Sequence, residues 1–195
     1  TAYEILTCDW SSDVCSSDLN TCMLDALRAV GDRCRGIVDI DENAPDGELD
    51  RLNRLGVRGV RVNVNPIKPP EPGFSKTMLA RIGRLDARCA ELGWMLDFLT
   101  PGWLTEELLP TLSKLKVSFT VAHMGMFLAR DGVKQAGFQR FLDFLRKGPG
   151  RCWVKLTGVY RMSVTPGFKD ADPLARALID RKSTRLNSSH MSESR

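Results

Sequence analysis

The feature that most constrains the fold is a regular alternation of two hydrophobic patterns between residues 20 and 179. Segments with apolar residues at helical spacing alternate with short apolar runs that are typical of strands. The expected helices are Thr21–Val30, Asp46–Leu55, Ser75–Leu92, Thr105–Leu115, Gly137–Arg146 and Asp170–Ile179. The expected strands are Arg35–Asp41, Val57–Asn65, Trp94–Leu99, Val117–His123 and Cys152–Thr157. Strands separated by helices of this length predict β/α units and a parallel sheet.

Two architectures of the α/β class are built from such units. A (β/α)8 TIM barrel closes eight of them within roughly 250 residues, so about five strands predict an incomplete barrel of this kind. An open, doubly wound sheet is the alternative. Its nucleotide-binding forms are disfavoured, because the sequence has neither a G-x-G-x-x-G after the first strand nor a Walker A motif.

The two ends of the chain, residues 1–19 and 180–195, show neither pattern and are rich in serine. Disordered tails are one interpretation. However, a single double-stranded DNA can encode both ends. One strand encodes residues 1–19, and the reverse complement, translated from its second base, gives D-R-K-S-T-R-L-N-S-S-H-M-S-E-S-R. This peptide is the whole of residues 180–195. That DNA also resembles a sequencing adapter. We therefore predict two adapter-encoded, non-biological ends around a partial barrel domain at residues 20–179.

The amino-acid composition limits the classes of binding partner and the cellular compartments that suit this chain. Residues 1–19 carry −4 and residues 180–195 carry +2, so the net charge of +4 for the whole chain becomes +6 for residues 20–179. The basic residues are scattered, whereas nucleic-acid binding needs a basic patch, so we expect a small anionic substrate and no nucleic acid. No apolar run approaches the roughly 20 residues of a membrane span. Cysteines without metal-like spacing predict reduced thiols and a cytoplasmic protein.

One strand carries polar residues on a face that a buried parallel strand would keep apolar. In the segment Val57–Asn65, the side chains of Arg61, Asn63 and Asn65 alternate with valines. This pattern predicts that the polar face lines the barrel interior near its carboxyl end, where barrel active sites lie. Arg61 either forms an ion pair with an internal acid such as Asp97 or binds a substrate carboxylate with two parallel hydrogen bonds.

The only histidine of residues 20–179, His123, ends the strand S-F-T-V-A-H. A single histidine is often structural, but the carboxyl end of a barrel strand is where catalytic residues occur. A neutral imidazole there can serve as a metal ligand, an electrophile or a base.

Polar residues follow two further strands. Arg161 comes just after the last expected strand, where Lys155 and Thr157 share one face; it is either a solvated loop charge or a substrate ligand. Asp39 and Asp41 close the first expected strand, and a capping role is the preferred interpretation for Asp41.

Three segments, R-G-V-R-V-N, V-A-H-M-G and W-V-K-L-T-G-V-Y-R-M-S, resemble in order and spacing the amidohydrolase-related family that contains 2-pyrone-4,6-dicarboxylate lactonase. The resemblance covers residues 20–179. It implies that His123 belongs to the catalytic centre and that Arg61 and Arg161 hold an anionic substrate. We include Asn63, on the same face as Arg61, among the expected substrate-binding residues.

The resemblance implies hydrolysis of a lactone or ester of a small carboxylated metabolite. A decarboxylase of an aromatic or pyrone acid and a non-catalytic binding barrel are the alternatives. Some relatives use one divalent metal, zinc or manganese, held by an H-x-H pair, and others use none. Residues 20–179 depart from the family pattern in several ways. They contain neither the H-x-H pair nor the terminal aspartate. Met126 stands at a position where the family commonly has arginine, and Ile67–Pro69 stands where the lactonase has a further arginine.

Overall fold

The computed structural model describes residues 4–6, 20–64, 74–148 and 150–180. Six parallel strands form one sheet in the order β1-β2-β3-β4-β5-β6, so each strand pairs with the next along the chain. The strands are β1 (Glu4–Leu6), β2 (Cys34–Val38), β3 (Val57–Asn63), β4 (Met95–Leu99), β5 (Phe119–Val121) and β6 (Cys152–Val154). The five predicted strands and the α/β class are therefore confirmed.

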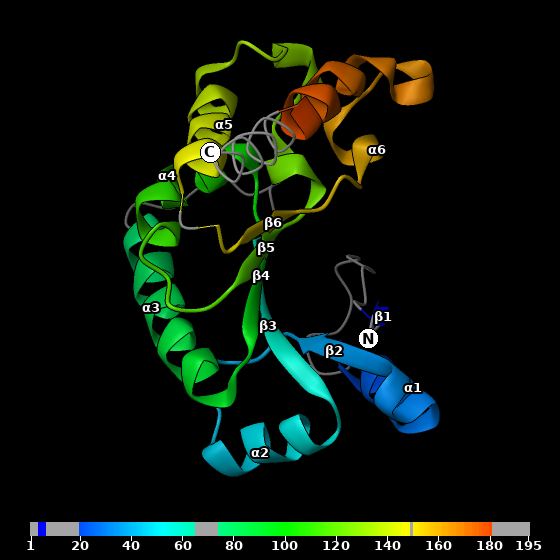
Figure 1. Cartoon of the computed structure of the whole chain (residues 1–195), viewed down its shortest axis with the longest axis vertical. Coiled ribbons are helices and arrows are strands. Elements are labelled where there is room, and N and C mark those ends of the chain that lie inside the picture. The colour runs from blue at the N-terminus through cyan, green and yellow to red at the C-terminus, as the bar shows by residue number, and fades with distance from the viewer. Residues whose placement is uncertain (1–3, 7–19, 65–73, 149, 181–195) are drawn as a thin grey trace, which may run out of the picture.

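Helices connect the strands, and Figure 1 shows α3, α4 and α5 along one side of the curved sheet. The α-helices are α1 (Thr21–Val30), α2 (Asp46–Arg54), α3 (Phe74–Leu92), α4 (Gly102–Leu112), α5 (Ala136–Lys147) and α6 (Val159–Met162), and residues 172–180 are also helical. The short 3-10 turns are η1 (Gly31–Arg33), η2 (His123–Met126), η3 (Ala129–Asp131) and η4 (Pro166–Ala171). No described helix is long and apolar enough to cross a membrane.

The two faces of the sheet bury different residues. Val60, Val62 and Phe98 belong to the large core between the strands and the helices. Alternation turns the neighbouring residues to the other face, where Leu99 and Ala122 form a separate small cluster with Met126. The sheet thus has a helix-covered outer face and an inner face, as in a section of a (β/α) barrel.

Boundaries differ most around α4, which was expected at Thr105–Leu115. The helix starts three residues earlier, at Gly102 after Pro101. A Cβ atom on Gly102 would lie 2.9 Å from the carbonyl oxygen of Met126, so a glycine at the first helical position permits the helix to approach the loop that follows β5. This close approach is a tertiary contact, which the helical spacing of apolar residues does not encode.

Besides the 3-10 turns, one strand and one α-helix were not expected. Residues 1–19 were predicted to lie outside the fold, yet Glu4–Leu6 forms the edge strand β1, with Glu4 opposite Cys34 and Leu6 opposite Gly36. These three residues cover an edge of β2 that would otherwise present unpaired backbone groups. The helix α6 also lies in a stretch expected to be loop, and it follows Gly158, whose φ of +68° is left-handed.

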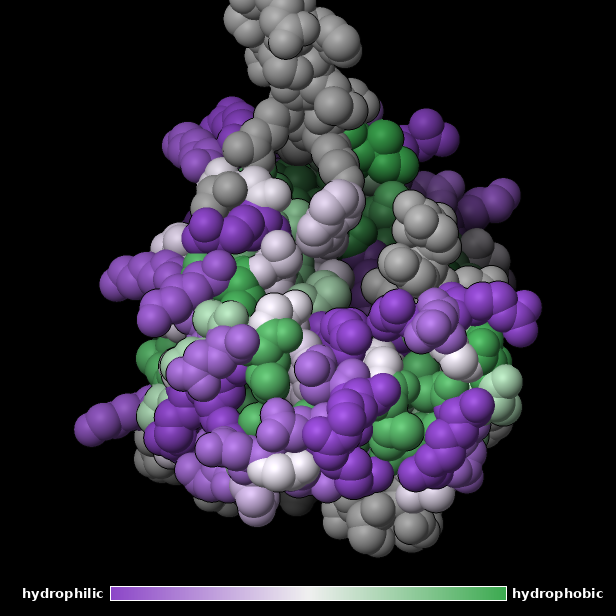
Figure 2. Space-filling model, turned by 60° about the horizontal axis from the view of Figure 1, so that its bottom comes forward, coloured by the Kyte–Doolittle hydropathy of each residue, from purple (hydrophilic) through white to green (hydrophobic). Residues whose placement is uncertain are grey.

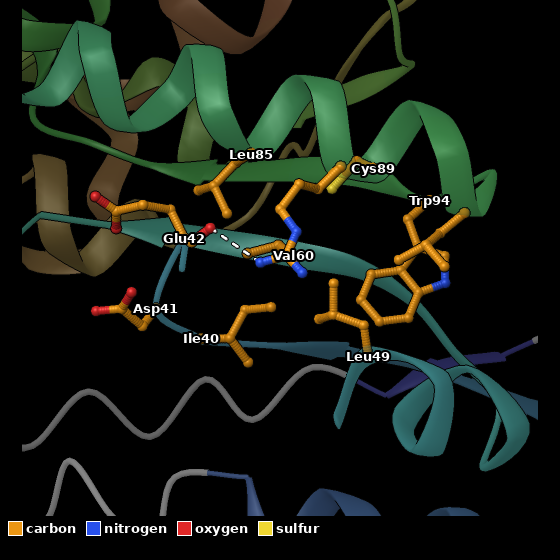
Figure 3. A pocket seen from close by; sticks show the side chains of 10 residues that line it. Ile40, Asp41, Glu42, Leu49, Val60, Leu85, Cys89 and Trp94 are labelled. Atoms are coloured by element: carbon orange, nitrogen blue, oxygen red, sulfur yellow. Dashed lines mark hydrogen bonds between the residues drawn. The ribbon is translucent and has the colours of Figure 1, made fainter. Parts of the chain in front are cut away.

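A small cavity between β3 and α3 is lined largely by apolar side chains, among them Val60, Leu85 and Trp94 (Figure 3). Arg88 on α3 also lines the cavity and donates a hydrogen bond of 3.2 Å to the carbonyl oxygen of Glu42, which links the β2–α2 loop to α3. At the end of the molecule that carries α2, the surface is mainly hydrophilic with separate hydrophobic patches (Figure 2).

Candidate active site at the carboxyl edge of the sheet

A fully buried carboxylate, Asp97 on β4, gathers charged groups from the neighbouring strands. Arg61 on β3 donates to its Oδ2 atom from Nε at 3.0 Å and from a terminal nitrogen at 2.9 Å. Lys155, just after β6, places its Nζ atom 2.8 Å from Oδ1, and the Thr120 hydroxyl on β5 donates to the same oxygen. Both carboxylate oxygens are therefore engaged, by side chains from two other strands and by the residue that follows β6.

Strand register explains why these residues meet. Arg61 lies opposite Asp97 in the β3–β4 ladder, and Asp97 lies opposite Thr120 in the β4–β5 ladder. They form one row across the inner face. Burial opposes ionisation of Asp97, but Lys155 and Arg61 outweigh it and hold the pKa of this carboxyl below its usual range. The row therefore contains an ionised acid held between two cations.

A second acid, Asp39, follows β2 at the same edge. Burial raises the pKa of its carboxyl group, although Arg81 and Arg61 act in the opposite direction. Its backbone is fixed by Asn20, which both donates to the Asp39 carbonyl oxygen and accepts from its amide. In contrast, Asp41 accepts a hydrogen bond from the amide of Asn43 at 2.7 Å, which supports the local capping role expected for it.

His123 begins the loop directly after β5 and is almost fully buried, with 3% of its surface exposed. The backbone of this loop is unusual, because His123, Met124 and Met126 all adopt positive φ angles of 50°, 54° and 57°. Left-handed conformations cost L-residues roughly 1–2 kcal/mol each. Such strain persists only where the surroundings impose it, and it clusters at functional sites.

The imidazole of His123 contacts the turn that follows β6. Its Nδ1 atom lies 3.0 Å from the hydroxyl oxygen of Thr157. Gly158 adjoins the ring so closely that a Cβ atom there would lie 2.2 Å from Nδ1.

The other two predicted residues lie at the same edge but are more exposed. Asn63 is the last residue of β3 and lies opposite Leu99. Arg161 lies on α6, which packs against η2, the turn that contains His123. The Nε atom of Arg161 is 3.3 Å from the hydroxyl oxygen of Tyr160, and its guanidinium group lies 5.6 Å from the centre of that ring.

Sequence reasoning anticipated part of this arrangement. The ion pair of Arg61 with Asp97, one of two interpretations of that arginine, is present. The predicted polar face is less open than expected, because Arg61 is buried against Asp97, while Asn65 lies outside the described residues. The contacts of Lys155 and Thr157 were missed. Their placement on one face of a strand was the available signal, but their partners depend on register.

A family model described as amidohydrolase matches residues 9–185. The chain therefore belongs to the amidohydrolase family, as the resemblance of its motifs predicted.

Two curated relatives act on lactones, according to their names. The chain is 32% identical over 162 residues to 4-sulfomuconolactone hydrolase of Hydrogenophaga intermedia, a match that covers 83% of this chain and 52% of the relative. It is 30% identical over 175 residues to 2-pyrone-4,6-dicarboxylate hydrolase of Comamonas testosteroni, covering 85% and 55%. The chain thus spans about half the length of the curated relatives it matches.

Solved structures share the fold. A Pseudomonas putida protein assigned as a 2-pyrone-4,6-dicarboxylic acid hydrolase superposes with a TM-score of 0.69 at 29% identity, covering 84% of this chain and 57% of that one. An amidohydrolase from Burkholderia multivorans, solved with bound zinc, gives a TM-score of 0.60 at 16% identity, covering 83% and 59%. The sheet and helices described above are therefore those of an amidohydrolase TIM barrel.

The Burkholderia multivorans neighbour holds zinc. Among the residues that the structure describes, no group of three or more His, Cys, Asp or Glu side chains could hold a metal ion. The described residues therefore do not form a metal site by themselves.

Proposed function

We propose that this chain is part of a hydrolase that opens a lactone of a small carboxylated metabolite. The proposal rests on one observation: two cations and a histidine lie at the same edge of the sheet. The cations are Arg61 and Lys155, which both pair with Asp97, and the histidine is His123. Cations bind carboxylates, and a histidine at the carboxyl end of a barrel strand is placed for acid–base chemistry. The names of the two lactone-hydrolysing relatives support the same reaction.

In this proposal, the substrate is held by its carboxylate groups. Arg61 donates a hydrogen bond to Asp97, so its guanidinium group is oriented before the substrate binds. Arg161, on the helix that packs against the His123 turn, supplies a second cation, and the amide of Asn63 supplies a neutral hydrogen-bonding group. Holding the ring in this way limits the orientations in which its carbonyl carbon meets water.

The reaction consumes one water molecule. Its oxygen adds to the lactone carbonyl carbon while His123 accepts the proton, and the ring C–O bond then breaks as the same proton is returned to the leaving oxygen. The product is a ring-opened acid with a hydroxyl or enol group at the former ring oxygen. Atoms and charge balance without any oxidant or reductant.

The full-length protein that contains residues 20–179 tests the proposal. It is incubated with 2-pyrone-4,6-dicarboxylate and with a muconolactone, and loss of the ring absorbance is followed together with product mass. A mass gain of one water is expected. Release of carbon dioxide would identify the alternative decarboxylase, and binding without turnover would identify a binding barrel; either outcome contradicts the proposal.

Variants of this protein assign the roles. We expect His123→Ala to lower kcat by roughly 10²–10⁴, the usual contribution of general acid–base catalysis. Arg161→Ala should raise KM and leave kcat nearly unchanged. Arg61→Ala should raise KM too, but it also removes a partner of buried Asp97, so its melting temperature should fall. Arg146→Ala, an exposed arginine on α5, is the matched control.

A further inference from the structure

The ring of His123 is held by a turn that belongs to the next strand. Thr157 Oγ1 lies 3.0 Å from its Nδ1 atom. The residue that follows, Gly158, has a left-handed φ of +68°, and a Cβ atom on it would lie 2.2 Å from Nδ1 and 2.4 Å from Cγ. The ring therefore occupies the space where any other residue would carry its side chain.

The two loops are also joined through their backbones. The amide of Met124 donates to the carbonyl oxygen of Lys155 at 3.0 Å, and the amide of Lys155 donates to the carbonyl oxygen of Val121 at 3.0 Å. These two hydrogen bonds link the segment after β6 to the His123 loop.

A neutral imidazole has two tautomers, and the hydrogen bond at one nitrogen decides which is present. Thr157 is an exposed residue, so its hydroxyl proton can go to water while its oxygen accepts a hydrogen bond from Nδ1–H. That arrangement leaves the lone pair on Nε2, the nitrogen that a base would use.

We propose that Thr157 and Gly158 are positioning residues for His123: Gly158 makes room for the ring, and Thr157 accepts the Nδ1–H proton and so keeps the lone pair on Nε2. The catalytic meaning of this inference rests on the proposed function of His123. The tautomer of His123, which Thr157 is proposed to select, can be measured without any substrate.

The direct test is 15N NMR of the imidazole, recorded at a protein concentration at which the chain stays monomeric. The chain contains two histidines, and His190→Asn leaves His123 as the only ring. At a pH where the ring is neutral, we expect Nδ1 to resonate as the protonated nitrogen and Nε2 as the unprotonated one. Thr157→Val should shift the tautomer ratio roughly threefold to tenfold towards Nε2–H, the change that loss of one ordinary hydrogen bond produces.

Matched variants separate this role from simple packing. Thr157→Ser keeps the hydroxyl and should retain the Nδ1–H tautomer, whereas Thr111→Val, on α4, should change nothing at the ring. Gly158→Ala should displace the ring and alter both nitrogen shifts. A parent ring in the Nε2–H tautomer, or a Thr157→Val ring identical to the parent ring, would overturn the inference.

Kinetics of the full-length protein distinguish this failure from failure of the proposed function. If both proposals hold, Thr157→Val lowers kcat about tenfold with little change in KM, and Thr157→Ser restores it. A protein that shows the predicted tautomer but opens no lactone refutes the proposed function while the tautomer selection by Thr157 stands. A protein with full activity in Thr157→Val refutes the positioning role alone.

Discussion

At the scale of single residues, Asp97 controls the charge balance of the site. It is fully buried and bonded to Arg61, Lys155 and Thr120. Removing one partner of a buried ion pair leaves the other charges uncompensated, which typically costs about 3–5 kcal/mol. We therefore expect Asp97→Asn to lower the free energy of unfolding by about 3 kcal/mol at neutral pH. Asp143→Asn, in an exposed pair with Arg146, is the control and should cost under about 1 kcal/mol.

The same substitution should change the pH dependence of stability. The pKa of Asp97 is lower in the folded protein than its ordinary value of 3.8. Its contribution is therefore present above pH 3.8 and is lost as the pH falls through the folded-state pKa. Urea unfolding between pH 7 and pH 2.5 should show the parent and Asp97→Asn converging at the acidic end. A constant difference over this range would contradict the assignment.

Sequence reasoning reached some of these residues and missed others for a physical reason. His123 and Arg61 were found because strand alternation and strand ends fix which way a side chain points and at which edge it lies. The contacts of Lys155 and Thr157 were not predicted, because they reach across the sheet or between loops. Such partners depend on strand register and on the left-handed turn at Gly158, and neither follows from hydrophobic periodicity.

At the scale of elements, α1 was predicted at its observed bounds, because its apolar spacing alone decides where it packs. Strand lengths were overestimated where the chain leaves the sheet early. The segment expected as Val117–His123 pairs only at Phe119–Val121, because the residues after it enter the left-handed loop. Because the residues of that loop are also apolar, the sequence pattern predicts a strand that extends beyond the last paired residue.

The edge strand β1 leads to a prediction about the first 19 residues. Its three residues form a short ladder with β2, so pairing contributes roughly 1–4 kcal/mol from two or three hydrogen bonds at their usual net strength. Ordering three residues costs roughly 3–6 kcal/mol, which leaves no net stabilisation from the ladder. We expect residues 20–195 to unfold in urea with an unchanged or slightly higher free energy than residues 1–195. A fall of more than about 2 kcal/mol would show that the opening segment is part of the fold.

At the scale of the whole molecule, the origin of the two ends remains our proposal. The reverse-complement relation between residues 1–19 and 180–195 motivates it. Amplifying the source gene with primers inside residues 20–179 and sequencing outward should give flanks that differ from both ends. Recovery of T-A-Y-E-I-L-T-C-D-W upstream in native DNA would contradict the proposal. The same experiment provides the full-length protein for the activity measurements.

The exposed side of β6 is expected to mediate contacts between copies of the chain. Among the described strands, β6 ends the sheet order, and large apolar side chains are exposed there and just beyond, with Trp153 at 55%, Tyr160 at 59% and Val164 at 89%. An open strand edge with apolar neighbours is a template for pairing with another chain. We therefore expect the chain as given to self-associate, to be poorly soluble and to open no lactone.

Self-association is measured by sedimentation velocity over a range of protein concentrations. Trp153→Lys should shift the chain towards monomer, because a lysine on an edge strand opposes edge-to-edge pairing. Leu79→Lys is the matched control, since Leu79 is also exposed but lies on α3, away from this edge. If β6 is the contact, only Trp153→Lys reduces the sedimentation coefficient. A parent chain that stays monomeric, melts cooperatively and opens a lactone would show that the sheet needs no further strands beside β6.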